Sequence, residues 1–428
     1  MDKNIETSFL QIMEEEMIPA MGCTEPIALA YAAALARKEL GEKPDSITAE
    51  CSGNMIKNVR CVFIPNSHGL TGIETACAMG AFGGDPQKVM EVLAGVSEED
   101  LALASKFVKD GKCEVVYLES DIPLHFIITL RNGEDTVSVE VRHAHTNIYK
   151  ITRNGEVVFL NDKVLEKGEA ADRSGLNLQN IKTFADEVDL AKIEPVISRL
   201  IQCNMAIARE GMKGTYGIGI GKLILDQYED DIFHEMRAYA SAASEARMGG
   251  CDMPVIINSG SGNQGISCSV PLIVYAEKKG IGKETLYRSL VFSALLTIYQ
   301  KEYIGKLSAF CGAISATCSS GAALTYMLGG SLDAIAHTID STLAITPGII
   351  CDGAKISCAA KINSGLEASL LAHRMVMSGK HYLPDTGIIR TLTDETVSTV
   401  GNIGKEGMRY TDQVIIASML KKKENSQK

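Results

Sequence analysis

The sequence predicts an α+β protein, in which a mixed α/β N-terminal domain is followed by a mainly α-helical domain. Two observations predict this class. Apolar and polar residues alternate with a period of two mainly between residues 46 and 160, which is typical of half-buried strands. From about Leu190 onward, Ala-, Leu-, Ile- and Met-rich segments alternate with clusters of Gly, Asn, Pro and Ser, which favours helices and their connections. Because 428 residues exceed one simple domain, we predict domains at residues 1–190 and 191–428.

The N-terminal residues 5–40 are predicted to be helical, with a break at Gly22 and Pro26. Pro26 suits the first turn of a helix, because the N–H that proline lacks has no partner there. Residues 161–190 are polar and lack strong periodicity. We therefore predict that they connect the two domains.

The strands are predicted in two stretches, residues 46–65 and 113–160. Asn-Gly pairs at 132–133 and 154–155 are typical of tight hairpin turns. Residues 72–107, between the two stretches, are predicted to be helical.

The composition limits the partners and the compartment. A net charge of −11 argues against nucleic acid or an anionic membrane as the main partner. The chain opens on acidic residues without a signal-like apolar stretch, and it contains no run of 18 apolar residues. We expect a cytoplasmic protein, free or as a homo-oligomer, whose 12 cysteines stay reduced.

Three cysteines are candidate ligands of a metal centre: Cys311 in "SAFCGAISA", and Cys351 and Cys358 in "PGIICDGAKISCAAK". Thiolates are the usual ligands of iron–sulfur clusters, and Gly312 and Gly353 beside two of them leave room for a bulky core. The spacing alone is equally consistent with three buried cysteines that have no chemical role.

Cys318 adds an ambiguity to this set, because it follows Cys311 by seven residues, as Cys358 follows Cys351. Four cysteines predict a closed zinc site or a fully ligated cluster. Three ligands instead leave one iron open as a Lewis acid.

A fourth candidate is Cys23 in "AMGCTEPIALA", just ahead of a predicted helix. The positive end of a helix lowers the pKa of a thiol, so Cys23 is a candidate base or nucleophile. Simple packing in a cap region is the alternative.

The segment "NSGSGNQGIS" is a candidate substrate loop. Its backbone N–H groups and short polar side chains suit a carboxylate, and apolar flanks indicate a loop that enters the interior. A surface loop is the alternative. The candidate binding residues are Ser259, Gly260, Ser261, Gly262, Asn263 and Gln264.

Four further polar residues follow strand-like segments: Asn54 and Lys57 in "CSGNMIKNVRC", and His145 and Asn147 in "HAHTNI". Lys57 is a candidate partner for a substrate carboxylate or a solvated surface lysine. His145 is a candidate general base or a hydrogen-bonded surface imidazole.

In combination these motifs resemble the L-cysteine desulfidase family, which is related to the iron–sulfur L-serine dehydratases. The resemblance runs from near residue 20 to Asp412 and rests on "GCTEPIALAYAAA", "GNMIKNVRCVFIPNS", "HAHTNI", "ARMGGCDMPVIINSGSGNQG", "FCGAISA" and "CDGAKISCAAK".

The resemblance implies a 4Fe–4S cluster held by Cys311, Cys351 and Cys358, with one iron open to substrate, and Cys23 as the catalytic base. It implies a carbon–sulfur lyase that converts L-cysteine into pyruvate, ammonia and hydrogen sulfide without pyridoxal phosphate. Cys318 has no place in the ligand set that the resemblance implies.

Three alternatives stay open at this point. An L-serine ammonia-lyase would use the same site with hydroxide as the leaving group. A pyridoxal-phosphate lyase is disfavoured, because no convincing Schiff-base lysine motif precedes "SGSGNQG". A non-catalytic four-cysteine metal or redox-sensing module would need Cys318.

Overall fold

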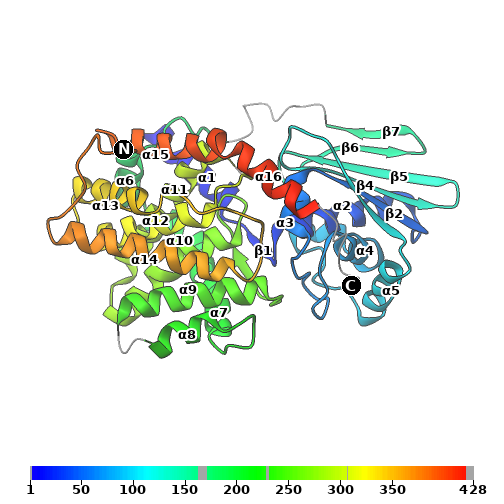
Figure 1. The fold of residues 1–428 in the computed structure, drawn as a ribbon, viewed down its shortest axis with the longest axis horizontal. Coiled ribbons are helices and arrows are strands. Elements are labelled where there is room, and N and C mark those ends of the chain that lie inside the picture. The colour runs from blue at the N-terminus through cyan, green and yellow to red at the C-terminus, as the bar shows by residue number, and fades with distance from the viewer. Residues whose placement is uncertain (1, 162–170, 228–230, 306, 421–428) are drawn as a thin grey trace.

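The computed structural model describes residues 2–161, 171–227, 231–305 and 307–420. It confirms the predicted α+β class: a region with a mixed sheet and its helices lies beside a region built almost entirely of helices (Figure 1). Each region has its own buried apolar core. The boundary at residue 190 stays a prediction. The N-terminal helix packs in the core of the helical region, and the C-terminal helix packs against a helix of the sheet region, so each chain end contacts the other region.

The first half of the chain holds seven strands and several helices among the described residues. In chain order they are α1 (Lys3–Glu16), β1 (Pro19–Met21), α2 (Thr24–Leu40), β2 (Ser46–Cys51), α3 (Gly53–Val59), α4 (Ile73–Gly83), η1 (Pro86–Glu91), α5 (Glu98–Lys109), β3 (Cys113–Tyr117), β4 (His125–Asn132), β5 (Asp135–Arg142), β6 (Ile148–Arg153) and β7 (Glu156–Leu160).

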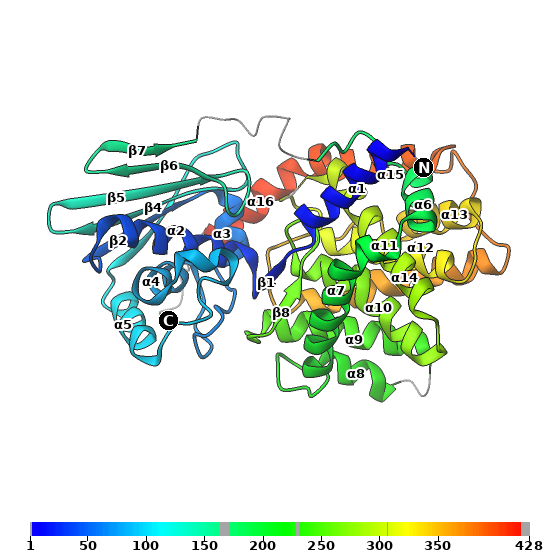
Figure 2. The ribbon, with the colours of Figure 1, turned by 180° about the vertical axis from the view of Figure 1, so that it is seen from behind.

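Six of these strands form one mixed sheet in the order β3-β2-β4-β5-β6-β7. β2 and β3 are parallel, whereas the other neighbours are antiparallel. Both predicted hairpin turns are confirmed, with Gly133 and Asn154 in the left-handed region. Helices α2 and α4 cover one face of the sheet, and α5 packs against α4 (Figures 1 and 2).

Two stretches correct the sequence-based prediction. The strand predicted within residues 46–65 ends at Cys51, and Gly53–Val59 forms α3, because Met55, Ile56 and Val59 are buried together at helical spacing. The connection predicted at 161–190 contains α6 (Leu178–Glu187), a helix capped by Asn177. Residues 162–170 of that connection lie outside the described part.

Apart from β8, the second half of the chain has only helices among the elements of its described residues. Its elements are α6, α7 (Leu190–Gly211), α8 (Ile220–Gln227), α9 (Ile232–Met248), β8 (Pro254–Ile256), α10 (Gly262–Lys279), α11 (Lys283–Ile304), α12 (Gly312–Met327), α13 (Leu332–Ile345), α14 (Cys358–Met377), α15 (Thr393–Asn402), η2 (Ile403–Gly407) and α16 (Arg409–Leu420).

The central helix α12 explains why this region needs small residues. Its sequence GAISATCSSGAALTYM is buried almost all round, between α10, α11, α13 and α14. A Cβ atom on Gly321 would lie 2.7 Å from Cβ of Ser369 on α14, so the two helices approach more closely than any side chain at Gly321 allows. The cluster-binding region that the sequence predicts is therefore a close-packed, rigid scaffold.

Both ends of the chain cross between the two regions. Helix α1 packs in the helical core, where the rings of Phe9 and Phe184 pack edge to face with their centroids 5.4 Å apart. Helix α16 leaves the helical region and lies against α3 (Figure 1). There Nζ of Lys57 donates to Oδ1 of Asp412 at 2.5 Å, and both side chains are largely withdrawn from solvent.

We expect Asp412→Asn to destabilise the protein, because it leaves the Lys57 ammonium buried without its counter-charge. Breaking one partner of a buried pair costs about 3 kcal/mol or more. The check is urea denaturation followed by circular dichroism. Arg409→Gln on the same helix is the matched control, since its pair with Asp121 is exposed. Equal unfolding midpoints for the two variants would contradict this role of the Lys57–Asp412 pair.

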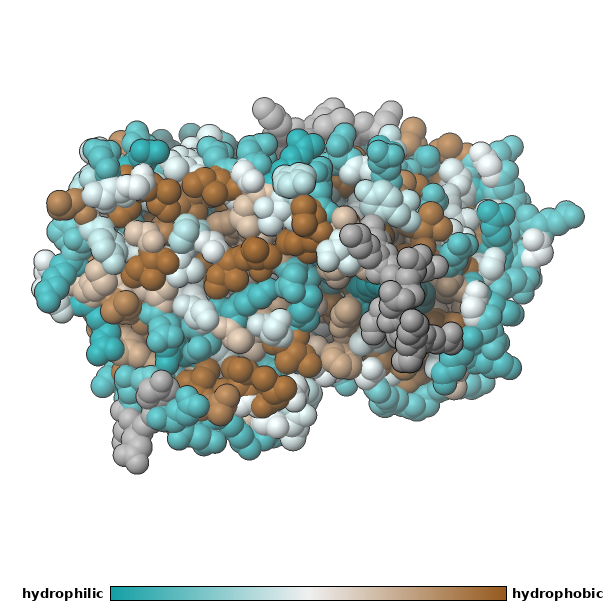
Figure 3. Space-filling model, in the orientation of Figure 1, coloured by the Kyte–Doolittle hydropathy of each residue, from teal (hydrophilic) through white to brown (hydrophobic). Residues whose placement is uncertain are grey.

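On the face of Figure 3, apolar side chains gather in bands over the helical region, whereas the sheet region is mainly hydrophilic. Exposed apolar residues of the helical region include Leu371, Met377 and Leu392. Homo-oligomer formation stays a prediction. In the described residues, no helix combines the length and the apolar character needed to cross a bilayer.

Candidate active site

A buried cavity of about 100 Å³ lies where α2, α10, α12 and α14 begin. This volume has room for several water-sized groups. Most of the residues that the sequence singles out line it together: Cys23, His145, Ser259, Gly260, Ser261, Asn263, Gln264, Cys311, Cys351 and Cys358. Their roles stay predictions, but segments more than 300 residues apart in sequence line one pocket.

A two-stranded sheet brings Cys23 next to the Ser/Gly/Asn loop. Strand β1 leads into α2, β8 leads into α10, and the two strands pair antiparallel. The hydroxyl of Thr24 then donates to the carbonyl oxygen of Gly260 at 3.0 Å. Pairing of the two strands therefore fixes the starts of two helices side by side.

A short backbone bridge brings the cysteines together. Phe310 and Ile350 form an isolated antiparallel bridge, the N–H of Cys311 donates to Ile349, and the N–H of Cys351 donates to Ala309. The thiols of Cys311 and Cys351 are hydrogen-bonded to each other. Cys358 begins α14 and lies close enough to interact electrostatically with both.

Cys318 lies elsewhere. It is fully buried in the middle of α12, where the hydroxyl of Thr342 and the carboxyl group of Asp340 are its polar neighbours. Among the described residues, no group of three or more His, Cys, Asp or Glu converges closely enough to hold a single metal ion. The arrangement therefore gives no support to a closed four-cysteine zinc site.

Of the three candidate ligands, only Cys351 has a lowered pKa. Its hydrogen bond with Cys311, followed by burial, raises the pKa of Cys311, and burial raises the pKa of Cys358. A hydrogen bond from Cys311 lowers the pKa of Cys351 to about 6, against the effect of burial and with help from the nearby Lys57 and Lys361. Burial lowers the pKa of Lys301, another lining residue, to about 8, and the charges of Cys351 and Cys311 oppose that shift.

Helix termini add to this positive environment. The N-caps of α2, α10, α12 and α14 are Cys23, Ser261, Cys311 and Ser357, and in the described structure none of these side chains accepts from a first-turn N–H. The N-caps of α1, α5, α6, α7 and α9 do. The helix starts around the cavity thus keep N–H groups available for an anion.

These residues fit an iron–sulfur cluster with three cysteine ligands. Three thiols from two loops line one cavity, together with the cationic side chains of Arg247 and Lys301. The Oε1 atom of the buried Gln264, another lining residue, has no hydrogen-bond partner in the described structure. Gly312 and Gly353 line the cavity, so the room that the sequence predicts beside the cysteines stays a prediction, and both glycines also allow close packing. A Cβ on Gly353 would lie 2.2 Å from the carbonyl oxygen of Lys57, and one on Gly312 2.7 Å from Nε2 of Gln264.

The prediction that the pKa of Cys23 is low is wrong. Burial, followed by the negative charge of Glu25, raises the pKa of Cys23 well above its usual value. The Cys23 thiol donates to Oε2 of Glu25 at 3.0 Å. Desolvation outweighs the helix dipole here, and Cys23 in this state is a thiol.

The Ser/Gly/Asn loop is held in a tight, buried turn. Asn258 and Ser261 form a backbone bridge, and Ser259 between them has φ 49°, which is unusual for a residue other than glycine. Asn263 Oδ1 accepts from Ser244 and from Nη1 of Arg247, each at 3.1 Å. This network fixes the Arg247 guanidinium against the loop.

Arg247 is a buried cation at the cavity wall. Its side chain lies close enough to Cys23 and Cys358 to affect both thiols electrostatically. In the described structure its Nε has no hydrogen-bond partner, and no ion pair with a carboxylate is present at Arg247. A buried guanidinium in this position fits an anionic ligand.

Four predicted binding residues lie outside the lining of this cavity. Gly262 begins α10 behind it, where a Cβ would meet Arg247. Asn147 donates to the carbonyl oxygen of Arg142 and closes the turn that carries His145. Lys57 is paired with Asp412.

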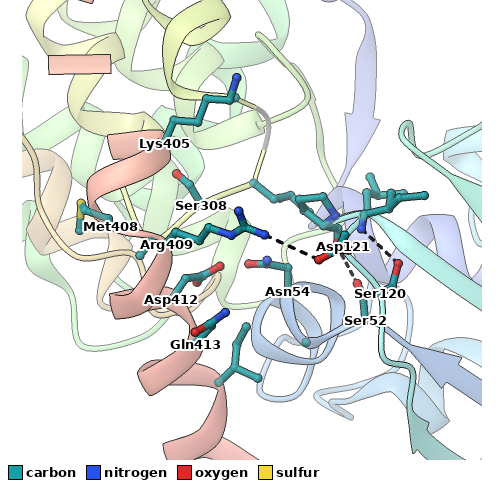
Figure 4. A pocket seen from close by; sticks show the side chains of 18 of the residues that line it. Ser52, Asn54, Ser120, Asp121, Ser308, Lys405, Met408, Arg409, Asp412 and Gln413 are labelled. Carbon is teal, nitrogen blue, oxygen red and sulfur yellow. Dashed lines mark hydrogen bonds and ion pairs between the residues drawn. The ribbon is translucent and has the colours of Figure 1, made fainter. Parts of the chain in front are cut away.

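Asn54 lines a second cavity, of about 500 Å³, between α3, the 120–124 loop, residues 304–305 and 307–309, and α16. Figure 4 shows Asn54 and Arg409 facing this space, with the ion pair from Arg409 to Asp121 beside it. Leu307 and Ser308 line both cavities.

Sequence reasoning missed Arg247, Lys301 and the role of Glu25 in the site. Arg247 and Lys301 lie near the C-terminal ends of α9 and α11. Each has an acid close by in the sequence, Glu245 and Glu302, so no local pattern distinguishes them from charges on a solvent-exposed face. Glu25 reads in the sequence as an ordinary first-turn acid. Its contacts with Cys23 and with Asn58 of α3 require the tertiary structure.

A family model for the serine dehydratase alpha chain matches residues 87–417. The chain therefore belongs to this family, which supports a lyase of the iron–sulfur serine dehydratase type. Cys311, Cys351 and Cys358 fall within the matched range, whereas Cys23 precedes it.

Several curated relatives match nearly the whole chain. Proteins from Lachnoclostridium phytofermentans and Treponema denticola are each 43% identical and cover 96% and 98% of this chain, respectively, and 99% of their own length. A protein from Vibrio parahaemolyticus is 36% identical over 96% of this chain and 98% of its own. All three carry the name UPF0597 protein, which states no activity.

Proposed function

We propose that this protein is an iron–sulfur lyase that eliminates the β-substituent of a small L-amino acid, with L-cysteine as the preferred substrate. The observation that carries the proposal is the single cavity lined by Cys311, Cys351 and Cys358 and also by Cys23 and the Ser259–Gln264 loop. Ligands for a cluster, a proton acceptor and a carboxylate-binding loop are the three parts that such an elimination needs.

The carboxylate of the substrate is assigned to the loop and to Arg247. The N–H groups at the start of α10 and the buried guanidinium offer fixed donors to an anion. A bound 4Fe–4S cluster with one open iron supplies a Lewis acid and a soft ligand for sulfur. Cys311, Cys351 and Cys358 are the residues that would hold it.

Cys23 is the residue that we expect to take the Cα proton of the substrate. His145 lies against the Gly260 turn. A Cβ atom on Gly260 would lie 3.4 Å from the imidazole of His145, so this ring packs against the loop. Cys23, Ser259, Asn263 and Gln264 are buried, which limits the access of bulk water while the Cα–H bond breaks. The aminoacrylate product then hydrolyses in water to pyruvate and ammonia.

Anaerobically purified protein is expected to turn over L-cysteine with a higher kcat/KM than L-serine, because thiolate is the better leaving group and the softer ligand. A tenfold preference needs only about 1.4 kcal/mol of differential transition-state binding. Pyruvate release measures both reactions, and sulfide release measures the first alone. A higher kcat/KM for L-serine would replace the desulfidase proposal by L-serine ammonia-lyase, which the family membership favours as the second candidate.

A further inference from the structure

The carboxylate of Glu25 has an unusual set of partners. It is buried at the start of α2 and lines the cavity. Its Oε2 accepts from the thiol of Cys23 and from the hydroxyl of Thr24, both at 3.0 Å. Its Oε1 accepts from the side-chain amide of Asn58 on α3 at 2.9 Å. Glu25 thus connects the proposed base to a second element of the fold.

These contacts hold Glu25 as an anion. Burial opposes ionisation, but the charge of His145 and the hydrogen bonds from Cys23 and Asn58 together lower the pKa of Glu25. A Cys23 thiolate beside this anion would place two buried negative charges at hydrogen-bond distance, which is costly. A base made of Cys23 alone therefore conflicts with its surroundings.

We propose that Glu25 is the positioning residue for Cys23 and receives the thiol proton of Cys23 while Cys23 takes the Cα proton of the substrate. This inference rests on the proposed function. The S–H···Oε2 hydrogen bond already directs the thiol proton towards Glu25 and leaves the sulfur lone pairs for another proton. With the two transfers coupled, a free buried thiolate never forms.

The step balances in protons and electrons. The Cα proton bonds to Sγ of Cys23, and the original thiol proton bonds to Oε2 of Glu25. The C–H electron pair forms the Cα=Cβ bond, and the Cβ–S bond breaks with its pair on the leaving hydrosulfide. The proton of Glu25 then passes to the hydrosulfide within the same cavity, which gives hydrogen sulfide and restores the carboxylate.

Glu25→Gln is the test, because glutamine keeps the size of the side chain and can still accept from Asn58 but cannot take the thiol proton. We expect unchanged iron content and a fall of about 100-fold or more in Cα–H exchange with deuterated water and in kcat. Alkylation of Cys23 by iodoacetamide, relative to the exposed Cys61, should become faster, since the opposing charge is gone.

The opposite signs of these two readouts separate proton transfer from a structural role. If activity rises together with alkylation, Glu25 only suppresses the thiolate and the inference fails. It also fails if Cys23→Ala keeps Cα–H exchange that Glu25→Gln loses, because the proton would then go directly to Glu25. Glu25→Asp should recover part of the exchange rate.

Glu74→Gln is the matched control, since Glu74 is the first-turn acid of α4 and lies outside the lining of the cavity. Normal turnover and exchange in Glu25→Gln overturn the relay and leave the proposed function intact. A wild-type protein that releases pyruvate from neither L-cysteine nor L-serine overturns the proposed function and the relay together.

Discussion

Replacing Cys311, Cys351 or Cys358 with Ala is expected to remove the iron–sulfur cluster and all lyase activity. Each of these thiols lines the cavity, and a cluster held by three ligands does not tolerate the loss of one. Iron and acid-labile sulfide per chain, measured after anaerobic purification, should fall from about four each to near zero. The visible absorbance of the cluster should disappear with them.

Cys318→Ala is the matched control for these variants. Cys318 lies on the same helix that Cys311 begins, but it contacts Thr342 rather than the cavity. Its removal should leave iron content and kcat/KM unchanged, with at most a small loss of stability from the lost sulfur atom. Cluster loss in the Cys318 variant would disprove the three-ligand arrangement and with it the open iron.

Arg247→Met is expected to raise the KM for the amino-acid substrate by about 30-fold to 1,000-fold, with a smaller effect on kcat. Methionine fills a similar volume without charge, so the carboxylate loses a buried charged partner, which costs about 2–4 kcal/mol. An interaction equally strong in ground and transition states acts on KM. Steady-state kinetics measure this change, and iron content confirms that the cluster is retained.

Arg237→Met on the same helix is the control for Arg247. Arg237 is also buried, but it pairs with Glu367 and does not line the cavity. Its loss should lower stability and leave KM unchanged. An unchanged KM in Arg247→Met, or an equal rise in both variants, would remove Arg247 from substrate binding.

Local chemistry made much of this protein predictable. Alternation of apolar residues predicts the strands of residues 113–160, and the two Asn-Gly pairs predict their turns, because both signals act between neighbours in the chain. Cys23 and the Ser259–Gln264 loop were recognisable because unusual residue types cluster there. Helix α3 was missed because its buried face forms against α16, α2 and β2, which no local pattern brings together.

Local patterns in the sequence were enough to predict the fold class, the candidate cysteines and the candidate substrate loop. The tertiary structure decided which of them share a space: pairing of β1 with β8 and the bridge from Phe310 to Ile350 join four distant segments at one cavity. It also separated Cys318 from Cys311, and it assigned Lys57 to Asp412. Above all it reversed the expected acidity of Cys23, because burial and a neighbouring carboxylate depend on segments that no local pattern brings together.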